Sequence, residues 1–159
     1  MAKVTDEMLA RVHCYGIGLW LSGLFGSFGR VLPDLEESPG AVRAVRLTDG
    51  LTVTLGRAAP QPDPRDALVL VRVEGGAAAP MPLGLDPATE TPASARAKLS
   101  ACTAGGAPDE IAAGDRRVSH FLMGGRIVEL RFGVGMIGFD RIVLARLGAA
   151  LDWRLSASR

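Results

Sequence analysis

The sequence predicts an α+β protein made of two tandem αβββ units. Their strands are expected to form one mainly antiparallel sheet, with the helices packed on one face. Three observations lead to this fold. Pro33-Asp34 recurs 75 residues later as Pro108-Asp109. A glycine-containing turn ends seventeen residues after each proline, at Asp49-Gly50 and at Gly124-Gly125. Each turn lies between two short runs with the composition of strands, so the chain resembles one helix-plus-hairpin unit used twice.

The length of 159 residues suits a single domain with its own core. The recurrence after 75 residues divides this domain into a first unit at about 5–74, a connector at about 75–90, a second unit at about 91–147 and a short tail at 148–159. We expect the connector to cross the surface and to be held through Met81, Leu83 and Leu85.

The first unit opens with a helix or a helix pair over about residues 5–28. Thr5 is a suitable N-cap, and apolar residues follow at helical spacing. The many glycines are tolerable where another element packs closely, or where one helix breaks into two. Gly29 is the expected C′ residue.

Three strands follow in the first unit, over 41–47, 51–55 and 67–73. The first two are joined at Asp49-Gly50, a pair that favours a type I′ turn. The third is apolar nearly throughout, which suggests a central strand. Pro60, Pro62 and Pro64 place an extended loop before it.

The second unit begins with a helix for which Thr91 is the N-cap and Pro92 the first residue. Gly105-Gly106 is its expected end. Strands are predicted over 117–123 and 126–132. Residues 139–147 fit either a strand or the start of a terminal helix, and the parallel with 67–73 favours a strand. The tail at 148–159 fits a short helix.

Composition argues against several classes of function. A net charge of +1, without a clustered basic stripe, gives no case for nucleic-acid binding. The longest uncharged run, 14–29, is shorter than the roughly 20 apolar residues of a membrane span. No secretory signal is evident, so we expect a cytoplasmic protein. Cys14 and Cys102 could form one disulfide, but buried free thiols are favoured. When free, the chain is expected to be a monomer or a weak dimer.

No pattern in the chain favours catalysis. His13-Cys14 has the residue types of a Cys/His nucleophilic pair, but adjacent helical residues point about 100° apart and cannot pair with each other directly. Each cysteine stands alone, with no closely spaced ligand pair of the kind found in structural zinc sites, which argues against a metal site. Glycines at 133, 135 and 138 match G-x-G-x-x-G, yet a strand is expected after them rather than the helix that a dinucleotide site needs. We therefore expect no enzyme and no cofactor.

A protein-binding surface is the alternative that the residues favour. Asp34, Glu36 and Glu37 belong to an acidic loop that is expected next to Arg43, Arg46 and Arg57. A patch of mixed positive and negative charge suits protein recognition. Trp20 and Trp153 are expected in the core or at its rim. The candidate partner-binding residues are Asp34, Glu36, Glu37, Arg43, Arg46, Asp49 and Arg57.

The second half contains the succession PLGLDPATETPASARAKL, GGAPDE and FLMGGRIVELRF. Over roughly residues 81–147 this resembles small bacterial immunity proteins of polymorphic toxin and contact-dependent inhibition systems. The tandem organisation is also similar to that of β-lactamase inhibitory proteins. The resemblance implies a cytoplasmic protein that binds one cognate toxin and blocks it. The alternative is a chaperone or adaptor for a secreted effector.

Overall fold

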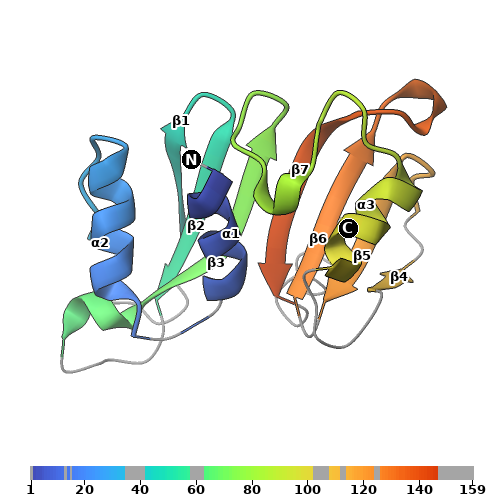
Figure 1. Ribbon diagram of the computed structural model, residues 1–159. Coiled ribbons are helices and arrows are strands. Elements are labelled where there is room, and N and C mark those ends of the chain that lie inside the picture. Colours follow the sequence, from blue (N-terminus) through green and yellow to red (C-terminus); the bar gives the residue numbers. More distant parts are fainter. Residues whose placement is uncertain are drawn as a thin grey trace.

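A computed structural model describes residues 2–12, 14, 16–34, 42–57, 63–101, 108–111, 114–123 and 126–146 of the protein. Its strands form one seven-stranded sheet in the order β1-β2-β3-β7-β6-β5-β4, and every neighbouring pair is antiparallel (Figure 1). The strands are β1 (Val42–Thr48), β2 (Leu51–Arg57), β3 (Leu68–Gly76), β4 (Asp109–Ile111), β5 (Val118–Met123), β6 (Arg126–Phe132) and β7 (Phe139–Arg146).

Three helices lie on the same face of this sheet, α1 (Ala2–Arg11), α2 (Gly18–Ser27) and α3 (Pro92–Ala101) (Figure 1). Their apolar side chains share one core with alternate residues of the strands. Val53 of β2 and Leu144 of β7 belong to this core together with Leu21 of α2 and Leu99 of α3. The α+β class with a mainly antiparallel sheet is therefore confirmed.

The helical segment predicted over 5–28 is a helix pair. The chain turns between α1 and α2 at Gly16, whose φ is +70°. At Gly18 a Cβ would lie 2.6 Å from the backbone of Arg65. Another element therefore packs closely on this helical glycine, as predicted. Gly29 ends α2 as predicted: its φ is +65°, and the N–H of Arg30 donates to the Phe25 carbonyl at 2.9 Å, the pattern of a Schellman motif.

Two local predictions were wrong. Thr5 does not cap a helix, because α1 begins at Ala2 and so includes this residue. The turn at Asp49-Gly50 does not have the type I′ conformation, which needs positive φ at both central residues. Only Gly50 has positive φ, at +79°, and the pairing of β1 with β2 shifts its register between Arg46 and Thr48. This irregularity accommodates the strand twist that a type I′ turn would otherwise match.

Six of the seven strands are those predicted, with ends that differ by a few residues. The last apolar segment is a strand, since β7 lies between β3 and β6. The third predicted strand is an interior one, and its pairing with β7 joins the two halves of the sheet. The additional strand, β4, has only three residues and lies at the edge, so it is too short for a recognisable alternation.

The connector is held by buried groups, as predicted for its apolar residues. Met81 and Leu85 are buried and Leu83 packs against the core. Thr91 caps α3 by accepting a hydrogen bond from the Ser94 N–H at 3.2 Å, and Pro92 is the first helical residue. The predictions for Cys102, for Gly105-Gly106, for Trp153 and for the tail at 148–159 lie outside the described residues.

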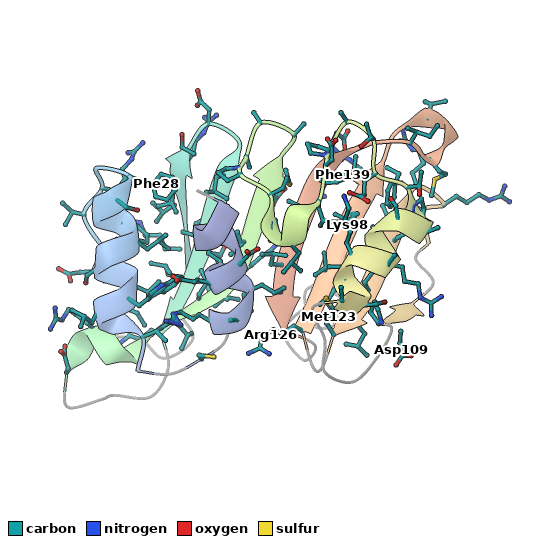
Figure 2. All side chains as sticks on the ribbon, in the orientation of Figure 1. Phe28, Lys98, Asp109, Met123, Arg126 and Phe139 are labelled. Carbon is teal, nitrogen blue, oxygen red and sulfur yellow. The ribbon has the colours of Figure 1, made fainter. Side chains whose placement is uncertain are left out.

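Glu90 completes this arrangement, although sequence reasoning gave it no role. Its carboxylate accepts hydrogen bonds from the Asp86 N–H at 2.9 Å and from the Ser94 hydroxyl. Lys98 lies 2.8 Å from Glu90 and also donates to the Gly84 carbonyl at 2.9 Å (Figure 2 shows this lysine on α3). The buried carboxylate therefore ties the connector to the start of α3.

Candidate functional site

Strand ends from both halves meet at one end of the β3–β7 pairing, in the middle of the sheet. The backbone brings them together directly, because the Gly76 N–H donates to the Gly50 carbonyl at 2.7 Å and Gly76 pairs with Arg141 of β7. The ends enclose a hollow of about 370 Å³. Its lining residues are Arg46, Gly50, Thr52, Glu74, Gly75, Gly76, Arg131, Asp140 and Arg141.

Glu74 is the central charge of this hollow. One of its carboxylate oxygens lies 3.0 Å from Arg72 and the other lies 2.7 Å from Arg141. Burial lowers the pKa of the Arg72 guanidinium and Glu74 counteracts it, but arginine ionises so far above neutrality that the side chain stays charged. The carboxylate of Glu74 therefore bridges two guanidinium groups at the hollow.

A second ion pair stands at the outer side of the hollow. Nε of Arg131 donates to Asp140 at 2.7 Å, and both side chains reach solvent. This hydrogen bond holds the pKa of Asp140 below, and that of Arg131 above, their ordinary values. Arg46 and Asp49 form a third pair at 3.1 Å, with Asp49 almost fully exposed. The hollow thus presents alternating positive and negative groups to solvent.

The structure separates the predicted binding residues into different places. Arg46 lines the hollow just described, and Asp49 forms an ion pair with this arginine. Asp34 and Arg57 instead line a smaller hollow of about 170 Å³ beside α2, together with Arg65. Arg43 is exposed, but it pairs in register with the core residue Leu55 and so lies on the opposite face from Arg46. Glu36 and Glu37 lie outside the described residues.

Sequence reasoning missed Arg72, Glu74, Arg131, Asp140 and Arg141. A usable signal was present: in each strand these charges interrupt or alternate with an apolar run, as in Val69–Glu74 and in Arg126–Phe132. Period-two alternation puts such charges on one face of a strand. What the sequence does not provide is the pairing of β3 with β7, which brings the two charged sets together.

One buried pair could suggest acid–base chemistry. Nε2 of His120 lies 2.6 Å from a carboxylate oxygen of Glu129, its register partner on β6. Both residues are buried, and Nδ1 of His120 has no hydrogen-bond partner among the described residues. Neither side chain lines either hollow described above. The pair therefore joins two strands without presenting a reactive group to one of these hollows.

The described part of the chain also gives no support for a Cys/His nucleophile, a metal site or a dinucleotide site. The Cys14 thiol donates to the Ala10 carbonyl at 3.4 Å, while His13 lies outside the described residues. No group of three or more His, Cys, Asp or Glu side chains within the described ranges could hold a metal ion. The segment Gly133–Gly138 joins β6 to β7, so the helix that a dinucleotide site requires is replaced by a strand.

Comparison with known proteins gives no further guide to function. No protein-family model, no curated protein and no solved structure matches this chain. Among the described residues, none of the helices combines the length and the apolar character that crossing a membrane requires.

Proposed function

We propose that this chain is a protein-binding inhibitor, an immunity protein that neutralises a cognate bacterial toxin by direct contact in the cytoplasm. The observation that carries the proposal is the hollow at the end of the β3–β7 pairing, where ion pairs are partly exposed. Mixed charge of this kind steers and orients a protein partner. No step of chemistry is needed for such an inhibitor, and it would act without a cofactor.

We further infer that the two halves are copies of one αβββ unit. In support, α2 and α3 begin 74 residues apart, at Gly18 and Pro92, and β2 and β6 begin 75 apart, at Leu51 and Arg126. The two three-stranded sets then meet through their last strands, β3 and β7. α1 and β4 have no counterpart. A duplicated scaffold of this kind leaves its loops free to vary for recognition.

Co-expression tests the proposal. We expect a toxin domain to be encoded beside this gene, and it should arrest growth when expressed alone but permit growth when expressed with this chain. A double variant, Arg131→Asp with Asp140→Arg, keeps an internal ion pair but inverts the charges shown to the partner. We expect it to weaken binding about tenfold, chiefly through slower association, because rim charges act mainly on the association rate. Calorimetry and stopped-flow binding would measure this.

The control is Arg116→Glu, a charge reversal at an exposed arginine between β4 and β5 that lies outside the hollow. It should leave binding unchanged. If wild-type protein neither rescues growth nor binds the toxin domain, the immunity proposal is wrong. If Arg116→Glu weakens binding as much as the charge exchange does, the loss is not specific to the hollow, and the hollow is not the binding surface.

A second candidate, a chaperone or adaptor for a secreted effector, is favoured by α2. This helix has no charged residue, and Leu19 is 78% exposed on it. Beside it lies a largely apolar hollow of about 280 Å³ that includes Trp20 and Gly23. A chaperone would hold an apolar effector segment there. Leu19→Ser would then weaken effector binding, whereas a toxin bound at the charged hollow would not respond to this change.

A further inference from the structure

The turn between β6 and β7 exposes two large apolar side chains within four residues. Val134 is 91% exposed and Ile137 is 63% exposed. Single exposed apolar residues are common on soluble proteins and need no explanation. These two differ because they share one short segment, Gly133–Gly138, which we call the apolar loop. In Figure 1 it forms the orange-red turn beyond the ends of β6 and β7.

Hydrogen bonds fix the apolar loop internally and at its base. The Gly133 N–H donates to the Gly138 carbonyl at 2.9 Å, and the Met136 N–H donates to the Gly133 carbonyl at 3.1 Å. At the base, the Gly138 N–H donates to the Glu90 carbonyl at 2.7 Å and the Phe139 N–H to Pro87 at 2.9 Å. The loop therefore rests on the connector that the Glu90 carboxylate ties to α3.

The backbone of the loop has a conformation that must be held in place. Gly135 and Gly138 have φ of +77° and +70°, and Met136, which is not a glycine, has φ of +60°. A Cβ on Gly138 would lie 2.8 Å from the Pro87 carbonyl oxygen, so the base fits closely. The Met136 side chain packs against the core. Strained backbone that surrounding contacts enforce is characteristic of binding loops.

We propose that the apolar loop is the anchor that this protein inserts into an apolar pocket of its protein partner. The inference rests on the proposed inhibitor function and names the partner's chemistry: a concave apolar pocket with charged groups at its rim. Arg131 and Asp140 lie two residues before and after the loop and supply the complementary charges. A pre-ordered loop loses little conformational entropy on binding, which favours affinity.

Two other occupants fit less well. A membrane surface attracts clustered basic residues, whereas the charges beside this loop are paired as Arg131–Asp140. A second copy of the chain would set one loop against another. Two side chains from each copy would bury far less than the roughly 800 Å² per partner of a specific interface.

A matched pair of variants tests the anchor. Val134→Ser with Ile137→Ser should weaken toxin binding by about tenfold to a hundredfold, as expected for a buried interface anchor. Val31→Ser is the control, because Val31 is also 91% exposed but lies just after α2. It should leave affinity unchanged. Circular dichroism should show the same melting temperature for all three proteins, since the altered side chains face solvent.

The result separates the anchor from the inhibitor function. If the double serine variant binds as wild type while the Arg131/Asp140 charge exchange weakens binding, the anchor is wrong and the inhibitor proposal stands. If the wild-type protein binds no toxin, the anchor can still be tested on its own. A photo-crosslinking residue is then placed at position 134 of the full chain and crosslinked in its own host. A crosslink at 134 to one protein, missing at position 31, supports the anchor. The anchor is wrong if position 134 crosslinks to a second copy or to nothing. It is also wrong if the protein sediments with phosphatidylglycerol vesicles in a way that depends on the loop.

Discussion

At the scale of single residues, Glu90 shows how one buried charge organises a region. Burial would raise the pKa of its carboxyl group, but hydrogen bonds from Lys98, Ser94 and the Asp86 N–H outweigh this and hold it below its ordinary value. A lowered folded-state pKa contributes stability that is present above the unfolded value, about 4.3. That stability is lost as the pH falls through the folded-state pKa.

We expect Glu90→Gln to lower the free energy of unfolding by about 2–3 kcal/mol at pH 7, because an amide cannot accept from all three donors. The difference from wild type should shrink as the pH falls through the folded-state pKa. Urea unfolding at several pH values would measure it. Asp109→Asn, at an exposed carboxylate on β4, should show no comparable loss (Figure 2 labels this residue). An undiminished difference at low pH would contradict the proposed charge effect.

At the scale of elements, α2 illustrates why one glycine is required and another is not. A Cβ at Gly18 would lie 2.6 Å from the carbonyl carbon of Arg65, in the short helix that precedes β3. At Gly23 a Cβ would meet nothing within 4 Å. Both positions are helical, so alanine is the better residue in intrinsic propensity at each. Tertiary contact alone distinguishes them.

Gly18→Ala and Gly23→Ala should therefore change stability in opposite directions. Gly23→Ala should raise the free energy of unfolding by roughly 0.5–1 kcal/mol through helix propensity. Gly18→Ala should lower it by about 1–3 kcal/mol, because backbone cannot yield as a flexible side chain can. Thermal unfolding followed by circular dichroism would compare the two. If both variants gained stability, α2 would not pack on the Arg65 backbone as described.

At the scale of the whole molecule, the β3–β7 pairing joins two halves into one sheet over one core. The main core cluster includes residues of both halves, from Met8 to Leu144. Glu74 of β3 reinforces the junction through its ion pair with Arg141 of β7. A domain with a shared core is expected to unfold in one cooperative transition.

Probes in the two halves should report the same unfolding midpoint. Trp153→Phe leaves Trp20 as the single tryptophan, so fluorescence then follows the first half. The imidazole proton resonances of His120 follow the second half. Glu74→Gln should lower both midpoints equally, because it weakens the junction that they share. Two separated midpoints would show that the halves unfold independently.

Prediction from sequence succeeded where local patterns decide structure. Alternation and short apolar runs between turns located six strands, Gly29 marked the end of α2, and Thr91-Pro92 marked the start of α3. It failed where the outcome depended on distant contacts or on few residues. Thr5 is a good cap by type, yet α1 extends before it. The arginines at 43, 46 and 57 are near in sequence, but strand alternation and hairpin geometry place them apart.

The sequence by itself determined the elements of this protein, their order and the antiparallel hairpins, because these follow from periodicity and turn chemistry over a few residues. Only the tertiary structure decided that β7 lies against β3, that Glu74 bridges two arginines and that the apolar loop rests on the connector. These contacts join residues about 50–70 positions apart, and local propensity does not specify which distant strands pair. The candidate binding surface arises from that pairing.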